Sequence, residues 1–285
     1  MLNHPLLKLA MHLYRRIRQH EIMALGAQMT YYLILSFFPF LIFLITVLSY
    51  TPLANEEIIS ALISVMPREA GVMINQILMD TWNASNQTLL SFGMIATLWA
   101  ASRGIKAVIR GINKAHGIQE KRPFLITQGI SILYLLIFVL VIILTFGLII
   151  FGKYIGSLIF DWLDIAYQFD YIWAFVQYVI PISIIILVFA FLYKTAPNES
   201  VAWIEAVPGA LFSTFGWLIT SYLFSLYVAH LGNFSKTYGS LGGIIILLLW
   251  LYISSIILLL GGEINAAVKH WRNDRIISMS KWKKE

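Results

Sequence analysis

Six long stretches of this chain contain no charged residue, and this feature constrains its fold most strongly. A helix needs about 20 apolar residues to cross the hydrocarbon core of a bilayer. Five stretches meet this length. In the second, the apolar part covers only residues 89–101, so its helix either continues past Arg103, with basic side chains reaching for the interface, or is partly re-entrant. The sequence predicts six spans, at about residues 29–50, 89–110, 124–151, 171–193, 203–228 and 241–262.

The composition indicates that lipid is the solvent for most of the chain. Hydrophobic residues make up 59% of the 285 residues, and the mean hydropathy is +0.79. Charged residues make up 12%, about half of the ~25% found in a soluble domain. A soluble globule of this size could not bury so much apolar surface. The chain, which has no cysteine, is therefore predicted to be an all-α, polytopic membrane helical bundle. Cytosolic enzymes, disordered proteins and disulfide-stapled secreted domains are excluded.

The Lys and Arg residues are distributed unevenly among the segments that connect the spans. Segments 1–28, 102–123, 194–203 and 263–285 hold 17 of them, and the alternate segments hold 3. Because segments rich in Lys and Arg remain in the cytoplasm, both termini are predicted to be cytoplasmic. The split also supports a complete second crossing, since a failed one would place the basic tail outside.

The spans divide the chain into a cytoplasmic N-terminal segment (1–28), a membrane domain (29–268) and a basic cytoplasmic tail (269–285). The N-terminal segment has the apolar face and basic rim of an interfacial helix on the cytoplasmic leaflet. A topology signal without lipid specificity explains the same pattern. The outer segment 51–88 is predicted to form two short amphipathic helices, separated at Pro67.

No group of side chains has the arrangement that catalysis requires. The closest carboxylates, Glu56 with Glu57 and Asp161 with Asp164, lie in segments predicted to face outside. No two histidines have the spacing of metal ligands; they are His4, His12, His20, His116, His230 and His270. We therefore predict no catalytic residue, metal, cofactor or nucleic-acid partner, and we expect His4, His12 and His20 to face water or lipid headgroups.

A row of basic residues follows the second span. On a helix, Arg103, Lys106, Arg110 and Lys114 fall within about 80° of arc. Apolar side chains occupy the opposite side, namely Ile105, Val108, Ile109 and Ile112. This basic ridge, as we call the four cationic residues, is predicted to lie at the cytoplasmic boundary, either as a topology anchor or as a docking site for an anionic lipid or another phosphorylated amphiphile.

Glu205 opens the fifth span and Glu263 closes the sixth. Charges at membrane depth are costly and usually paired, and Arg103 is the expected partner because all three lie near one boundary. The interpretations are a structural ion-pair network, a gate or coupling site for protons or ions, and simple exposure to solvent. Helix kinks are predicted at Pro39, Pro181 and Pro208, as in a transporter-like core or through ordinary helix bending.

Several short motifs along the chain resemble one known family. They are Ala24–Tyr32, Ser36-Phe37-Phe38-Pro39, Leu98–Gly104, Asn113-Lys114-Ala115, Tyr193–Asn198, Pro208-Gly209-Ala210, Tyr238–Gly243, Trp250-Leu251-Tyr252 and Gly261–Asn265. Their order and spacing resemble the YihY/virulence factor BrkB family over about residues 10–270. The resemblance implies a six-span protein of the bacterial plasma membrane. It also brings an older family label, ribonuclease BN, which the scattered acidic and His residues do not support.

These features predict transport or translocation of an anionic, amphipathic, lipid-like substrate. The alternative is a non-transporting envelope scaffold or stress and resistance factor that acts through partners. The chain has no G-x-x-x-x-G-K-[ST] loop, so an ion gradient or a partner would supply any driving force. The expected partners are membrane lipids, above all anionic ones, together with other membrane proteins or a second copy of the chain.

Overall fold

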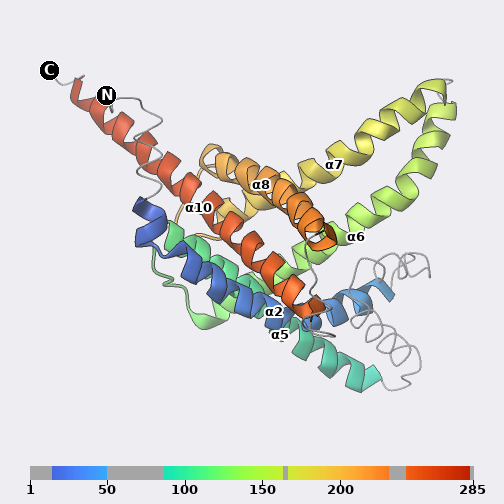
Figure 1. Cartoon of the computed structure of the whole chain (residues 1–285), viewed down its shortest axis with the longest axis horizontal. Helices are drawn as coiled ribbons and strands as arrows, with labels where there is room; N and C mark the ends of the chain where they lie inside the picture. The colour runs from blue at the N-terminus through green and yellow to red at the C-terminus, as the bar shows by residue number, and fades with distance from the viewer. Residues whose placement is uncertain (1–14, 50–86, 163–165, 231–241, 283–285) are drawn as a thin grey trace.

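The computed structural model of the protein describes residues 15–49, 87–162, 166–230 and 242–282 (Figure 1). Within these ranges every long element is a helix and no strand is present, which confirms the predicted all-α class. The long helices are α2 (Ile22–Ser49), α5 (Gln87–Ala115), α6 (Phe124–Trp162), α7 (Ala166–Thr195), α8 (Trp203–His230) and α10 (Gly242–Trp282). A short helix over residues 15–19 precedes α2.

Four of these helices are long and apolar enough to cross a membrane. Their apolar segments are Phe124–Thr145, Phe175–Thr195, Trp203–Val228 and Gly242–Lys269, and they match the third to sixth predicted spans. Helix α2 contributes a shorter apolar segment, Ile22–Phe37, and α5, which carries the basic ridge, is not among the four. The six-span count and the surface helices stay predictions; residues 1–14 and 50–86, where most of those surface helices fall, lie outside the described residues.

The four segments rich in Lys and Arg meet at one end of the bundle, which we call the polar end. Arg16 contacts both the C-terminus of α5, through the Ala115 carbonyl, and Glu263 of α10. Arg122 donates to the Ala196 carbonyl at the end of α7, 2.9 Å away. These contacts bring the start of α2, the end of α5, the start of α6 and the end of α7 to the same end of the bundle. Which side of the membrane the polar end faces stays a prediction.

The buried apolar core takes residues from α2, α5, α6, α7 and α8, and α5 supplies the largest share of them. The apolar face of α5 is buried there, as predicted, with Ile109 and Ile112 fully inaccessible. Close approach of the helices depends on small residues: a β-carbon on Gly104 would collide with Ser36 of α2, and one on Gly111 with Leu259 of α10. Apolar side chains at helical spacing thus fix one face of α5 against two neighbours and leave the other face outward.

Polar side chains inside the bundle are mostly paired with one another. Several hydrogen bonds join different helices, among them Gln128 to Ser102 at 2.6 Å, Tyr193 to Ser213 at 2.6 Å, and Thr30 to Ser255 at 3.4 Å. Such bonds satisfy buried polar groups and connect helices in a medium without water. They give the interior hydroxyls a structural role.

Helices α6 and α7 form a long antiparallel hairpin that extends away from α2, α5 and α10 (Figure 1). Its outer surface is apolar, since Leu133, Leu136, Leu140 and Leu187 are all exposed. Pro181 lies within α7, Pro39 within α2, and Pro208 near the start of α8. All three helices continue past their proline, and the kinks stay predictions.

Candidate functional site

The basic ridge occupies the outward face of α5. Arg103, Arg110 and Lys114 are exposed, and Lys106 is half-buried. Eleven residues separate the first from the last, which at 1.5 Å per residue makes the ridge about 16 Å long. Within the described ranges, none of the four forms an ion pair with a carboxylate. The helix therefore presents a continuous line of positive charge without an internal counter-ion.

Aromatic rings contact the middle of the ridge. The Lys106 ammonium lies 3.9 Å from the centre of the Phe124 ring at the start of α6. The Arg110 guanidinium lies 4.9 Å from the centre of the Tyr32 ring on α2. Cation–π contacts of this kind orient a cation without neutralising its charge. The rings leave the cationic groups able to attract an anion.

The ridge extends far along the helix axis from the polar end. Gly104, next to Arg103, packs against Ser36 of α2. Arg103 lies 12 residues before Ala115, where α5 ends at the polar end, so it is about 18 Å from that end along the helix axis. The hydrocarbon core of a bilayer is about 30 Å thick. Arg103 and Lys106 fall within the predicted second span, residues 89–110, and their depth in the bilayer stays a prediction.

Glu263 is fully buried and has two basic partners, neither of which is Arg103. Arg16 donates from Nε to Glu263 Oε2 at 2.9 Å, and His20 Nδ1 contacts Oε1 of the same carboxylate. The second arm of Arg16 donates to the Ala115 carbonyl at 2.7 Å. The expected pairing with Arg103 is wrong, because α5 carries Arg103 too far from the polar end. The expectation that His20 faces water or headgroups is also wrong, because its ring contacts the buried Glu263 carboxylate.

Glu205 serves mainly as a helix cap. Its carboxylate accepts a hydrogen bond from the Ala202 backbone N–H at 2.9 Å, in the manner of a capping box at the start of α8. Its basic partner is Arg272, at 3.5 Å, whose side chain is about half exposed. Glu205 and Glu263 therefore belong to separate ion pairs rather than to one network through Arg103.

A second polar group at the same end joins the α5–α6 connection to the α7–α8 connection. Asn113 accepts from the Asn198 backbone N–H at 2.9 Å and donates to Glu120 at 2.9 Å. Glu120 forms an ion pair with Arg122, which lowers the pKa of Glu120 chiefly through their hydrogen bond and raises the pKa of Arg122. Sequence analysis assigned these residues no role, although Asn113 and Asn198 fall in motifs that carry the family resemblance.

His116 is buried beside this group. Its Nδ1 lies 2.9 Å from Glu199 Oε1, and the other oxygen of Glu199 lies 2.8 Å from the Lys269 ammonium. Burial lowers the pKa of His116, against the opposing effect of Glu199. Burial alone would raise the pKa of Glu199, but Lys269 and His116 lower it. His116 is thus neutral at pH 7, and its Nε2 has no hydrogen-bond partner among the described residues.

Asn265 connects α10 to the start of α8. Its Oδ1 accepts from the Gly209 N–H at 2.6 Å, and its Nδ2 donates to the Ala206 carbonyl at 3.1 Å. Pro208 precedes Gly209 and has no N–H to donate. The side chain of Asn265 therefore satisfies backbone groups where α8 and α10 approach each other most closely.

Comparison with known proteins identifies the family. The sequence profile described as "Virulence factor BrkB" matches residues 13–285. The chain belongs to the BrkB family. It is 40% identical to "Putative ribonuclease-like protein YfkH" of Bacillus subtilis, over 89% of this chain and 92% of the relative. It is 30% identical to a UPF0761 membrane protein of Pseudoalteromonas translucida, over 71% and 65% of the two chains. A UPF0761 membrane protein of Alteromonas mediterranea is 26% identical over 89% and 85%. No solved structure matches.

Family membership and the apolar helices together establish a membrane protein. The predicted all-helical fold is confirmed for the described residues, and so is the prediction that this is a membrane protein. Among the described residues, no group of three His, Cys, Asp or Glu side chains could hold a metal ion. The family name describes no reaction, so function has to be argued from the ridge and its surroundings.

Proposed function

We propose that this BrkB-family protein translocates an anionic, amphipathic, lipid-like substrate, and that the basic ridge of α5 receives its headgroup. One observation carries the proposal: four cationic side chains, with no carboxylate partner among the described residues, line an outward helix face from the polar end to about 18 Å along the axis. A charged side chain at the centre of a bilayer costs about 2.5–3.5 kcal/mol on insertion scales. An anionic headgroup moving along this face would offset that cost.

The depth of the ridge distinguishes translocation from simple anchoring. A topology anchor needs its charges only at the interface, where lipid phosphates lie. Lys114, at the polar end, fits that description, whereas Arg103 falls inside the predicted second span of residues 89–110. Lys and Arg side chains can reach several ångströms towards the interface, which is short of the distance from Arg103 to the polar end. A line of cations at graded depth supports stepwise movement of an anion.

The ridge can be tested by charge removal in a matched pair of variants. The triple substitution Arg103→Gln, Lys106→Gln and Arg110→Gln should weaken the binding of phosphatidylglycerol to protein in phosphatidylcholine nanodiscs by about 3 kcal/mol, at roughly 1 kcal/mol per charge. The loss should shrink at high salt. Glutamine at Lys281, Lys283 and Lys284 removes equal charge from the tail. Equal losses from the two triples would refute a site on α5.

Translocation itself is measured with proteoliposomes that contain fluorescent phosphatidylglycerol. Dithionite bleaches only the outer leaflet, so a translocating protein makes more than the outer half of the label accessible. The ridge triple should return bleaching to the level of protein-free vesicles. Binding without exchange, in the presence and absence of a pH gradient, would contradict translocation by this protein alone. That result would favour the scaffold alternative, which the paired hydroxyls in the bundle interior also support.

We do not extend the ribonuclease-like name of the Bacillus subtilis relative to this chain. Glu263, Glu120 and Glu199 at the polar end form ion pairs with Arg16, Arg122 and Lys269, and His20 and His116 contact two of these carboxylates. A hydrolase needs such groups open to substrate and water. Purified protein should therefore degrade RNA no faster than a mock preparation. Cleavage that disappears in a Glu199→Gln or Glu263→Gln variant would overturn this.

A further inference from the structure

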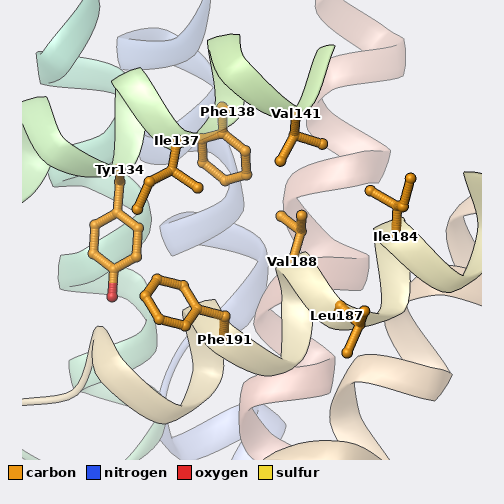
Figure 2. A pocket seen from close by; sticks show the side chains of 8 residues that line it. All are labelled: Tyr134, Ile137, Phe138, Val141, Ile184, Leu187, Val188 and Phe191. Atoms are coloured by element: carbon orange, nitrogen blue, oxygen red, sulfur yellow. The ribbon is translucent and has the colours of Figure 1, made fainter. Parts of the chain in front are cut away.

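A pocket of about 240 Å³ lies between α6 and α7, and none of its lining residues belongs to α5, which carries the ridge. Figure 2 shows side chains from both helices converging on it. Each helix supplies four lining residues with the spacing i, i+3, i+4 and i+7, which places them on one helical face. They are Tyr134, Ile137, Phe138 and Val141 of α6, and Ile184, Leu187, Val188 and Phe191 of α7.

The lining offers almost no polar group to an occupant. At one end, the rings of Tyr134 and Phe191 meet edge to face, with centroids 5.9 Å apart. The Tyr134 hydroxyl contacts the Thr195 hydroxyl, which donates to the Phe191 carbonyl at 2.5 Å. Both hydroxyls are therefore satisfied within the protein. A buried water needs two to four polar partners, so neither water nor a polar ligand fits this pocket.

The pocket lies in the parts of α6 and α7 that are long and apolar enough to cross a membrane. The lining residues fall within the apolar segments Phe124–Thr145 and Phe175–Thr195. Leu187 is both a lining residue and 63% exposed, so the pocket is continuous with the outer surface of the hairpin. The medium against that surface is lipid hydrocarbon. We propose that the pocket binds one hydrocarbon chain of a membrane lipid, as a site separate from the ridge.

The physics of the site sets the size of the effect. A lipid chain is already in an apolar medium, so no hydrophobic transfer drives it into the pocket. The favourable energy of binding comes from dispersion contacts between the chain and the pocket walls, which the wall atoms lack when the pocket is empty. Occupancy should therefore exceed that of the surrounding lipid several-fold rather than by orders of magnitude. Because the lining is apolar, the headgroup should not matter.

The site is testable with phosphatidylcholine and phosphatidylglycerol that carry a photoreactive diazirine on one acyl chain. After illumination in vesicles, residue-level mass spectrometry compares Ile137, Phe138 and Val141 with the outward Leu136 and Leu140 of the same helix. Simple lipid exposure would label the outward residues more. A bound chain should label the pocket residues several-fold more, equally with both lipids, and excess unlabelled lipid should compete.

Filling the pocket supplies the variant test. Val188→Trp and, at the other end, Val141→Phe should each remove the excess labelling, whereas Ile219→Trp on the exposed face of α8 should not. Unchanged labelling of α8 and monodisperse elution show that a variant is folded. If both filled variants keep the excess, or wild type lacks it, the site does not exist. The ridge triple should leave pocket labelling unchanged, so failure of the pocket and failure of headgroup docking on α5 are distinguishable.

Discussion

Replacing Glu263 with glutamine should destabilise the polar end more than any other conservative change there. The carboxylate is fully buried, and it joins the short N-terminal helix to α10 through Arg16 and His20. Glutamine has nearly the same shape, but it leaves the guanidinium of Arg16, which is only 12% exposed, without its counter-charge. Breaking a buried ion pair by removing one partner costs about 3–5 kcal/mol.

The retained contact between Arg16 and the Ala115 carbonyl places the expected loss near the lower end of that range. A cation at the C-terminus of a helix is stabilised by the helix dipole, by up to about 1 kcal/mol when exposed. The Arg16 guanidinium therefore keeps one favourable interaction in the variant. We expect a loss of about 3 kcal/mol in the free energy of unfolding, measured by equilibrium titration with SDS in mixed micelles and followed by tryptophan fluorescence.

Glu205→Gln is the matched control. Glutamine keeps an oxygen that can accept the Ala202 N–H, and the ion pair that is lost is 3.5 Å long with a half-exposed arginine. Such a pair contributes at most about 1 kcal/mol. The two substitutions remove the same charge from the same end of the molecule. Equal losses from both would refute the view that burial and pairing of Glu263 dominate.

A double-mutant cycle tests whether Arg16 and Glu263 stabilise the protein as a pair. Arg16→Met alone leaves Glu263 buried with His20 as its remaining basic partner, so it should also be costly. The double variant Arg16→Met with Glu263→Gln removes both charges, and an ion pair replaced as a unit by neutral groups is often tolerated. The double variant should be more stable than the sum of the two losses predicts. Additive losses would mean that the two side chains act independently.

Three further predictions concern packing, titration and topology. Gly209→Ala should cost about 1–3 kcal/mol by overpacking, because its β-carbon would collide with the Gly261 carbonyl, whereas Gly129→Ala meets open space and should gain up to about 1 kcal/mol in helix propensity; the same SDS titration measures both. The lowered pKa of His116 means that the unfolded chain binds the proton first, so stability should fall as pH drops below about 6.5, and this dependence should flatten in His116→Asn, as measured by the apparent melting temperature across pH 5–8. A cysteine at the exposed position Gln119 should be labelled by an impermeant thiol reagent in inverted vesicles but not in intact cells; the reverse would overturn the predicted orientation.

Helices and their faces could be predicted from the sequence because they depend on local spacing. Apolar residues at helical intervals identified the buried face of α5, where Ile109 and Ile112 are inaccessible. The same logic fails for ion pairs. Arg16 is 247 residues from Glu263 along the chain. The count of Lys and Arg residues in each segment uses Arg16 only to predict topology and does not assign it a partner. Which cation reaches Glu263 depends on how far each helix extends, and that is a tertiary property.

The length of α5 is a related case. The sequence placed Arg103 at the boundary because the charge-free stretch ends there. The structure continues α5 to Ala115, so the polar end lies at the end of the helix and not at its first charge. The acyl-chain pocket was also not predicted. Two apolar stripes are an ordinary pattern on membrane helices, and only the pairing of α6 with α7 makes them face one cavity.

Eight basic residues of the described chain form two groups with different surroundings. Arg16, Arg122, Lys269 and Arg272 each have a carboxylate partner, and together they tie connections and helix ends at the polar end. The four ridge residues have aromatic neighbours or open surface instead. Glu120, Glu199, Glu205 and Glu263 are engaged with other basic residues, and no ion pair among the described residues joins a carboxylate to the ridge. The proposal that an anionic lipid supplies the counter-charge rests on this difference.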